Sequence, residues 1–362
     1  MPSREVEQMK LLERYIFTTL MRSTIMTLFS LVALLVFFNF VDQLDDVGEG
    51  LFDVGDAFLV AVFSSPRFLY ELFPVAVLIG ALLGLGLLSN NSEINAMRAY
   101  GFSIKHIAIS LAKLGLLLLT LTGFSGEVAG PVAEKFAQDY KFERKESAVA
   151  LRSKYGFWAK DGTSFVNIRN VSTDKHLANV YLYEFTNSKE LVLASKAKRA
   201  NFKNDIWVLS DVQQTQFDDI ATKVRNLDKA DWTANFNANL LSAAVVSPSM
   251  LPVWQLGEFI DYLVANELNA AEYQVAYWLK LATPFAAFVM LFLAIPFVIG
   301  SQRDGSKGKR VFIGAMLGAS FFLLTRAMSH VAVAYDVSPA FTTMLPSLVF
   351  LGSALWLLKR VR

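Results

Sequence analysis

The side chains that most often perform covalent chemistry are scarce in this sequence. The 362 residues include no cysteine and three histidines. They contain neither the His-Glu-x-x-His pattern of zinc enzymes nor a Gly-x-Ser-x-Gly nucleophile turn. The lack of cysteine excludes disulfides and thiolate metal sites. We therefore expect a protein that is not an enzyme and that holds no metal or cofactor. Its histidines are His106, His176 and His330.

One segment of the sequence resembles a phosphate-binding loop but lacks part of its motif. Gly300 and Gly305 have the required spacing, yet Ser306 and Lys307 follow where a Lys-Ser/Thr pair is needed. Such a loop also follows a strand of a soluble domain, whereas this one follows a long apolar segment. We expect no nucleotide hydrolysis by this chain, so any ATP-driven activity must use a separate ATPase subunit.

Three basic residues lie inside long apolar segments: Arg67, Lys280 and Arg326. A charge near the centre of a membrane-spanning helix costs roughly 2.5–3.5 kcal/mol, so each needs a partner or a purpose. Glu71 lies one helical turn from Arg67, and a lysine can extend outward to the lipid headgroups. Arg326 has no acidic residue within a turn of its own helix, so it is the first candidate for binding an anion. Outward extension and pairing inside an assembly are the alternatives.

The polar segment 89–103 has the signals of a short helix between two apolar segments. Ser92 can cap its start, Glu93 falls in the first turn where the helix dipole favours a negative charge, and Gly101 can end it. Short helices of this kind are how membrane subunits of ATP-driven transporters contact their motor, although a capped connecting loop is the plainer alternative. A helix near 91–101 would present Glu93, Ile94, Met97, Arg98 and Tyr100.

The elements that must position these residues are membrane-spanning helices. Hydrophobic residues make up 54% of the sequence, and the mean hydropathy is +0.40. Long uncharged runs are the sharper sign, because about 20 apolar residues cross the hydrocarbon core of a bilayer. Two further runs, 104–126 and 311–334, carry isolated charges. We therefore predict an α-helical membrane protein with six spans. The four uncharged runs are 23–41, 72–92, 281–302 and 337–358.

The segments between these runs separate by the sign of their charge. Lys and Arg gather in residues 1–22, 89–105 and 300–310 and at the C-terminus, whereas the segment after the first run is acidic. The positive-inside rule then places both termini in the cytoplasm, and an even number of spans agrees. The basic N-terminus resembles a signal peptide, but its apolar run is too long and lacks a cleavage site, which predicts an uncleaved first span.

The long stretch between the third and fourth apolar runs has a different composition. Segments rich in β-branched and aromatic residues alternate with turn formers, and Asp161-Gly162 suits a hairpin turn. Because no helical pattern lies between these segments, we predict an antiparallel β-sandwich or jellyroll domain over 131–250. The candidate strands are 155–160, 163–170, 179–186, 191–202 and 206–212.

The chain returns to the membrane through an amphipathic segment. Pro252 suits a helix start, and apolar residues then recur three and four positions apart. This helix either lies along the membrane surface or packs on the β-rich domain. The predicted organisation is therefore 1–130 with three spans and the short helix, 131–250 with the antiparallel β-domain, and 251–362 with the linker helix and three spans. The apolar residues of the linker helix are Leu256, Phe259, Ile260, Leu263 and Val264.

Six short motifs, in register with this topology, resemble a known family. This is the LptF/LptG family, the membrane subunits of the bacterial lipopolysaccharide export transporter, and the resemblance covers essentially the whole chain. FVDQL and WAKDG favour the LptG branch over the LptF branch. The motifs are RYI at 14–16, FVDQL at 40–44, GALLGLG at 80–86, SE at 92–93, FWAKDG at 157–162 and LPS at 345–347.

The resemblance implies a non-catalytic permease subunit in the bacterial inner membrane, with six spans and a periplasmic β-jellyroll. It implies three protein partners: an LptF-like second membrane subunit, a homodimeric LptB-like ATPase and an LptC-like jellyroll protein. The ligand would be lipopolysaccharide, extracted from the outer leaflet and passed to a periplasmic bridge. On this basis Glu93 and its helix contact the ATPase. Our further hypothesis is that Arg326, helped by Arg67 and Lys280, binds lipid A phosphates in a cavity shared with the second subunit.

The jellyroll offers a second place for lipid. An open-ended domain of this kind can carry acyl chains through an apolar interior and hand them to a similar domain by pairing of strand edges. An ordinary filled core explains the same residues equally well, and the domain of the second subunit can supply the path alone. The candidate lining residues are Phe165, Val180, Leu182, Phe185, Leu193, Phe202, Trp207 and Leu209.

One departure from the family pattern concerns the outer end of the first span. Basic residues suited to lipid phosphates are expected there, but this chain has Asn39 and then Asp45-Asp46. Phosphate must therefore be held elsewhere or through bridging cations. Two other classes stay open: a mechanotransmission subunit that acts on a periplasmic partner without moving lipid, and an intramembrane enzyme that modifies lipids. The first usually has four spans, and the second needs a catalytic constellation that the sequence lacks.

Overall fold

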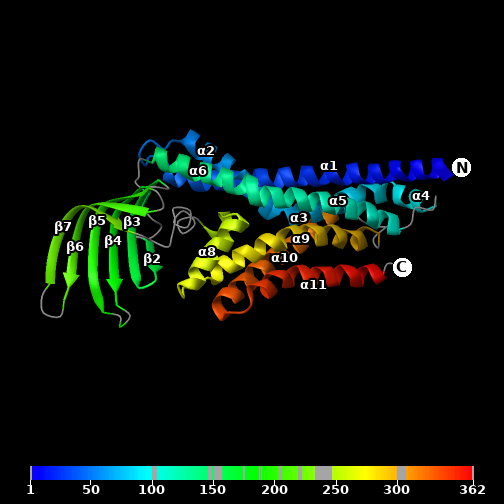
Figure 1. The fold of residues 1–362 in the computed structure, drawn as a ribbon. Coiled ribbons are helices and arrows are strands. Elements are labelled where there is room, and N and C mark those ends of the chain that lie inside the picture. The colour runs from blue at the N-terminus through cyan, green and yellow to red at the C-terminus, as the bar shows by residue number, and fades with distance from the viewer. Residues whose placement is uncertain are drawn as a thin grey trace. The chain divides into compact units, whose positions relative to one another are not determined.

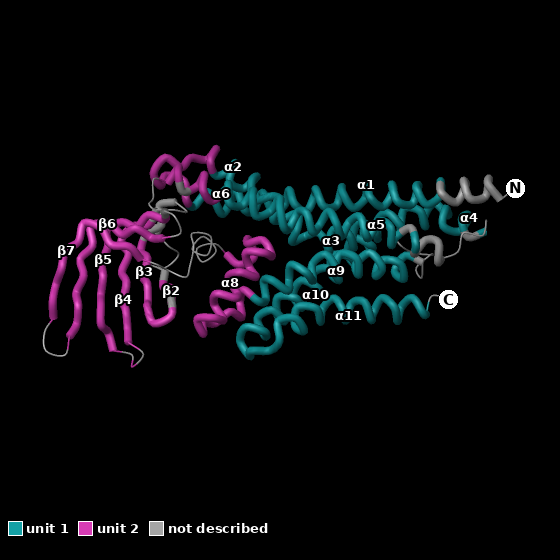
Figure 2. The backbone as a smooth tube through the Cα atoms, in the orientation of Figure 1, with its two compact units in different colours: residues 1–45, 57–137, 274–362 teal, residues 46–56, 138–273 magenta. Residues whose placement is uncertain are grey.

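The chain forms two compact units in the computed structural model (Figure 2). The membrane unit comprises Met1–Asp45, Ala57–Ala137 and Gln274–Arg362, and the sheet unit comprises Asp46–Asp56 and Gln138–Tyr273. The first part of the connection between the first two spans, residues 46–56, therefore belongs to the sheet unit. The residues that the structure describes are 2–99, 104–145, 149–150, 157–173, 176–186, 188, 190–203, 206–218, 222–232, 247–299 and 307–360.

The membrane unit is built from helices whose length and composition suit a bilayer. Within the described residues six helices qualify, as the sequence predicts. The third is continuous from α5 through a π-helical turn, Ser125–Ala129, into α6. α1 begins and α11 ends at the same end of this unit (Figure 1). The spanning helices are α1 (Pro2–Gln43), α3 (Ser65–Asn90), α5 (Ile104–Phe124) with α6 (Gly130–Arg144), α9 (Ala271–Ile299), α10 (Lys307–Tyr335) and α11 (Pro339–Arg360).

Small residues let neighbouring helices approach α3, which is largely buried in the membrane unit. Gly80 faces α1, and a Cβ at this position would lie 2.5 Å from the Cα of Thr24. Close approach of backbones at small residues is a common way for helices to associate inside membranes. Larger neighbours such as Leu78 and Leu82 fill the core on either side. The GALLGLG motif therefore has a packing role in this chain.

The sheet unit contains one antiparallel sheet, inserted between the third and fourth spans. Its strand order is β1-β3-β4-β5-β6-β7, and β2 also pairs with β3. In the β2–β3 hairpin Asp161 pairs with Ser164, and Gly162 has the positive φ of 59° that suits a two-residue turn. The strands are β1 (Val149–Ala150), β2 (Phe157–Asp161), β3 (Ser164–Thr173), β4 (His176–Phe185), β5 (Leu191–Lys203), β6 (Ile206–Phe217) and β7 (Thr222–Trp232).

The sheet bends along one line that crosses its strands. Asn179 on β4 and Asp211 on β6 lie on this line, and each has a positive φ of 55°. Inward-facing residues of a strand normally alternate with a period of two, but Leu209 and Val212 are both buried although three positions separate them. The left-handed residue between them inverts the pleat, so the apolar face stays inside on both sides of the bend. The predicted fold class, six spans with an inserted jellyroll-like antiparallel sheet, is confirmed.

The amphipathic helix α8 (Val253–Ala265) packs within the sheet unit, which is one of the two placements that the sequence allowed. The hydroxyl of Tyr262 donates to the carbonyl of Lys160 at 2.8 Å. In return, Lys160 Nζ donates to the carbonyl of Asn266 at 3.0 Å, and the amide of Gly162 donates to the side chain of Asn266 at 3.2 Å. The Lys and Gly of the WAKDG motif therefore fasten the β2–β3 hairpin to the end of α8.

Candidate functional site

Arg67, in the first turn of α3, contacts two carboxylates of its own chain. Its Nε lies 3.7 Å from Glu71 Oε1, and its Nη1 lies 3.7 Å from Oε1 of Glu134 on α6. The Glu134 side chain is buried, and that of Arg67 is 24% exposed. Arg67 therefore links the second and third spans by charge, in the kind of local pairing that the sequence left open.

Lys280 on α9 is buried and paired. Its Nζ donates to the carbonyl of Gly126 at 2.8 Å and lies 3.3 Å from Glu127 Oε1. Both acceptors belong to the π-helical turn between α5 and α6, where the usual pattern of backbone bonding is interrupted. The hydroxyl of Tyr70 on α3 donates to the carbonyl of Lys280 at 3.2 Å. Lys280 therefore ties the fourth span to the second and the third.

Arg326 on α10 differs from the other two because it is exposed. Its guanidinium carbon lies 5.3 Å from the centre of the Phe322 ring, a cation–π contact within its own helix. Glu71 is near enough for the charge of Arg326 to attract its carboxylate, but within the described part of the chain no direct ion pair forms with Arg326. Of the three predicted cations, Arg326 is the one most accessible to a ligand.

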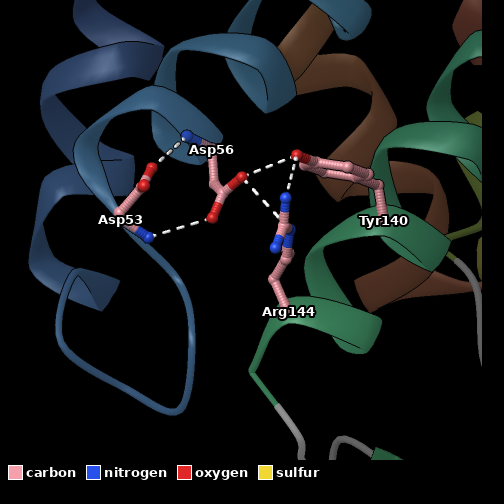
Figure 3. Close-up of polar contacts among 4 residues, drawn as sticks. All are labelled: Asp53, Asp56, Tyr140 and Arg144. Atoms are coloured by element: carbon pink, nitrogen blue, oxygen red, sulfur yellow. Dashed lines mark hydrogen bonds and ion pairs between the residues drawn. The ribbon is translucent and has the colours of Figure 1, made fainter.

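The acidic segment after the first span is held by the end of α6, a relationship that the sequence did not reveal. α2 (Val54–Phe63) begins with a reciprocal cap, in which the amide of Asp56 donates to Asp53 Oδ1 at 2.9 Å and the amide of Asp53 donates to Asp56 Oδ2 at 3.0 Å. The hydroxyl of Tyr140 donates to the remaining oxygen of Asp56, Oδ1, at 2.6 Å. Arg144 Nε lies 3.3 Å from the same oxygen, as Figure 3 shows.

The environment of Asp56 favours its ionised form. The Tyr140 hydroxyl has the largest effect in holding the pKa of the Asp56 carboxyl below its ordinary value, while burial of the side chain opposes it. The amide of Asp53 and the guanidinium of Arg144 also lower this pKa. Each donor stabilises the charged carboxylate and thereby disfavours its protonation.

Basic residues at the same end of α6 form ion pairs with other acidic residues of the segment after the first span. Asp46 forms ion pairs with Lys141 and, at 2.6 Å, with Lys145, and Lys145 also lies 2.9 Å from Glu49. Basic residues near a helix C-terminus are common because they interact favourably with the helix dipole, so their presence in the sequence was no specific signal. The acids lie about a hundred positions earlier in the chain, and only tertiary packing brings the two groups together.

α4 (Glu93–Ala99) forms where the sequence predicts a short helix. Glu93 is partly exposed in its first turn, and its Oε1 accepts a hydrogen bond of 2.9 Å from Asn91 Nδ2. Tyr15 on α1 lies close enough to Glu93 for its hydroxyl to interact with the carboxylate. The RYI and SE motifs therefore lie near each other, and Asn91 orients the Glu93 carboxylate.

The other residues predicted for α4 divide between packing and positions outside the described structure. Ile94 and Met97 are buried in the main core of the membrane unit, so they attach α4 to its own chain. The side chain of Arg98 and the whole of Tyr100 lie outside the described residues. Glu93 is therefore the one described member of the set with an accessible polar group.

The predicted lining residues of the sheet fall into two groups. Four are buried in the interior of the bent sheet, and the other four are partly exposed. Aromatic rings connect members of the two groups, since the rings of Phe202 and Trp207 lie 5.0 Å apart. The buried group is Val180, Leu182, Trp207 and Leu209, and the partly exposed group is Phe165, Phe185, Leu193 and Phe202.

Six apolar helices, charge pairs between spans and an inserted sheet define a multi-pass membrane protein with an extramembrane domain. Residues 14–360 match the family model described as "Lipopolysaccharide export system permease LptF/LptG". The chain therefore belongs to the LptF/LptG family of lipopolysaccharide export permeases.

Two relatives bear the same name, "Lipopolysaccharide export system permease protein LptG". The protein of Escherichia coli (strain K12) is 32% identical over 356 residues, which cover 96% of this chain and 98% of that protein. The protein of Haemophilus influenzae is 31% identical over 355 residues, which cover 97% and 99%. The similarity therefore includes the spans and the inserted sheet alike.

Proposed function

We propose that this chain is one of two membrane subunits of an ATP-driven transporter in the inner membrane. The transporter extracts lipopolysaccharide from the outer leaflet and passes it to a periplasmic bridge. The observation that supports the proposal best is the similarity to named lipopolysaccharide export permeases, which extends over nearly the whole chain. The six spans and the inserted bent sheet agree with it. The proposed partners are an LptF-like membrane subunit, a homodimeric LptB-like ATPase and an LptC-like jellyroll protein.

The proposed orientation follows the distribution of charge. Basic residues gather at the N-terminus, around α4, before α10 and at the C-terminus, and such segments stay in the cytoplasm. α1 begins and α11 ends at one end of the membrane unit, which fits a common side for both termini (Figure 1). The sheet unit then lies in the periplasm, where a soluble partner can reach it.

The motor contact that we propose is α4, with Glu93 as its central residue. The chain has no complete nucleotide-binding loop, so hydrolysis belongs to a partner. Buried Ile94 and Met97 attach α4 to the membrane unit, while Asn91 orients the Glu93 carboxylate. An oriented, partly exposed carboxylate is suited to pair with a basic residue of the ATPase.

The phosphate site that we propose centres on Arg326. Its guanidinium is exposed, and its charge lacks a direct partner among the described residues. Arg67 and Lys280 are already paired with carboxylates of this chain. They therefore contribute to phosphate binding mainly by long-range electrostatic attraction. A lipid phosphate binds Arg67 directly only by competing with Glu71. Of the two carboxylates that contact Arg67, Glu71 is the more exposed.

The bent sheet is proposed as a conduit for acyl chains. Buried residues such as Val180, Leu182 and Leu209 line its apolar interior. Photo-crosslinkers at these three positions are expected to capture lipopolysaccharide during ATP-driven export, whereas one at Val224, 58% exposed on β7, is expected to capture none. If only crosslinkers in the second membrane subunit capture lipid, that subunit provides the path alone.

Reconstitution tests the proposed function as a whole. The chain is purified with its second membrane subunit and its ATPase and placed in liposomes that contain lipopolysaccharide. We expect ATP-dependent transfer of lipopolysaccharide to the soluble jellyroll partner, and no transfer with an ATPase that cannot hydrolyse ATP. A complex that hydrolyses ATP and acts on a cell-wall preparation without binding lipopolysaccharide would support the mechanotransmission alternative instead.

A further inference from the structure

Arg310, in the first turn of α10, is buried with 6% of its surface exposed. Its Nη1 donates to the carbonyl of Gly86 at 2.8 Å, and its Nη2 donates to Asn90 Oδ1 at 2.9 Å. Both acceptors are neutral, and both belong to the last turns of α3. The carbonyls at a helix C-terminus carry partial negative charge, which a guanidinium at this place offsets. Arg310 thus joins the start of the fifth span to the end of the second.

Gly86 leaves the space that the guanidinium occupies. A Cβ at this position would lie 2.5 Å from Arg310 Nη1 and 2.6 Å from its Cδ, closer than such contacts permit. The atoms in the way are those of a flexible side chain and not of a backbone. An alanine at position 86 therefore displaces the guanidinium and leaves both helices intact.

The end of α3 also sets the direction of α4. Asn91 and Ser92 alone separate the two helices, and Ser92 holds a positive φ of 59°, which turns the chain sharply. The amide of Asn91 bonds back to the carbonyl of Leu87 at 3.1 Å, and the amide of Ala96 bonds to the carbonyl of Ser92 at 3.0 Å. No flexible linker separates α3 from α4, so a change at the end of α3 reorients Glu93.

We propose that Arg310 is a positioning residue for the motor contact: it couples the start of α10 to the orientation of α4. This inference rests on the proposed function of α4. The same helix carries Arg326, the proposed phosphate site, 16 residues further on, a distance of about 24 Å along the helix axis. Lipid bound on α10 and the ATPase bound to α4 then influence each other through Arg310, Gly86 and Asn90.

The coupling between lipid and hydrolysis tests this inference in the assembled complex. We compare Arg310→Lys, which keeps the charge but loses the fork of donors, with Gly86→Ala, which displaces the guanidinium without changing it. Gly308→Ala is the matched control, because it lies on the same helix and a Cβ there meets nothing within 4 Å. Assembly and basal hydrolysis should stay as in the wild type, while stimulation of hydrolysis by lipopolysaccharide falls about fivefold or more in both variants, within the usual range of coupling between linked sites.

A distance measurement separates positioning from loss of structure. The chain contains no cysteine, so nitroxide labels attach only where cysteines are introduced. Ala96 on α4 and Phe312 on α10 are exposed and suit such a pair in the two-subunit membrane complex before the ATPase is added. We expect a shifted or broadened distance distribution in Arg310→Lys and in Gly86→Ala, and an unchanged one in Gly308→Ala.

The outcomes distinguish this inference from the function on which it rests. If Glu93→Ala uncouples export while Arg310→Lys and Gly86→Ala keep wild-type stimulation and distances, the positioning role is wrong and the motor contact stands. If Glu93→Ala leaves ATPase binding and export unchanged, α4 is not the motor contact, and the distances alone then decide whether Arg310 orients α4. Should Arg310→Lys fail to assemble, Gly86→Ala decides the question, because it retains every charge.

Discussion

The hydroxyl of Tyr140 near the end of α6 donates a 2.6 Å hydrogen bond to the carboxylate of Asp56 in the first turn of α2, 84 positions away in the sequence. The same carboxylate caps α2 through the amide of Asp53. One side chain therefore both starts a helix and fastens the segment after the first span to the end of the third.

Removing the Tyr140 hydroxyl should loosen that attachment. Tyr140→Phe deletes one donor from a buried carboxylate and keeps the ring, so a loss of about 1.5–3 kcal/mol is expected, as for hydrogen bonds to charged groups. Hydrogen exchange of the amides in 46–56, measured in the purified complex, should quicken accordingly. Tyr335→Phe is the control, because Tyr335 is 76% exposed. Equal protection of the segment in both variants would contradict the prediction.

Acid should release the same segment. The pKa of Asp56 is lowered in the folded chain, chiefly by Tyr140, so its stabilising effect is complete above the unfolded pKa of about 3.9 and is lost as the pH falls through the lower folded value. After correction for intrinsic exchange rates, protection of 46–56 should be constant near neutral pH and decrease below about pH 4. In Asp56→Asn, protection of 46–56 should already be lower near neutral pH, and the part of the acid-induced decrease that is due to Asp56 should be absent. An identical decline in Asp56→Asn would assign the effect to other acids.

The ion pair between Lys280 of the fourth span and Glu127 of the third should respond unequally to loss of one partner or the other. Glu127→Gln leaves the Lys280 charge buried, at 4% exposure, and is expected to cost about 3 kcal/mol. Lys280→Met leaves a carboxylate that is 25% exposed, and solvent lowers the cost of that change. The double variant should recover much of the loss, because it leaves no unpaired charge. Thermal unfolding of the four proteins in detergent gives the comparison, and simple additivity of the two losses would argue against a direct pair.

Charge reversal at Arg326 should impair lipid binding before it impairs assembly. Arg326→Glu opposes a phosphate, so transfer of lipopolysaccharide should fall at least about tenfold, whereas Arg326→Lys should retain part of it. Lipopolysaccharide-stimulated hydrolysis and crosslinking are measured together, with Lys359→Glu at the end of α11 as the control for charge reversal. Normal assembly with undiminished export in Arg326→Glu would show that this residue does not bind the phosphate.

Glu93→Ala should weaken the motor contact. A basic residue of the ATPase that pairs with Glu93 would be left buried and unpaired, at a cost of about 2–5 kcal/mol in affinity. If Glu93 does no more than stabilise its own helix end, the change costs about 0.3–1 kcal/mol and leaves affinity unaltered. Titration of the ATPase against the membrane complex distinguishes the two, with Glu190→Ala in the sheet unit as the control. Wild-type affinity and export in Glu93→Ala would remove α4 from the proposed motor contact.

The sequence by itself determined the elements whose signal is local. Long apolar runs, four of them uncharged, located the six spans, because hydrocarbon requires a minimum length of apolar helix whatever surrounds it. Alternating strand segments and Asp161-Gly162 predicted the antiparallel sheet and its hairpin, since both depend on neighbouring residues. The SE motif predicted α4 in the same way. These features would be read equally well from a short window of the chain.

Only the tertiary structure decided which polar groups, distant in the sequence, form hydrogen bonds with the buried charged side chains. Asp56 meets Tyr140 across 84 positions, Lys280 meets Gly126 across 154, and Arg310 meets Gly86 across 224. No periodicity predicts such pairs, because a side chain chooses its partner after the helices have packed, and packing depends on surfaces drawn from the whole chain. The sheet's bend has the same origin, since the left-handed residues that create it lie on separate strands and act together only once those strands have paired.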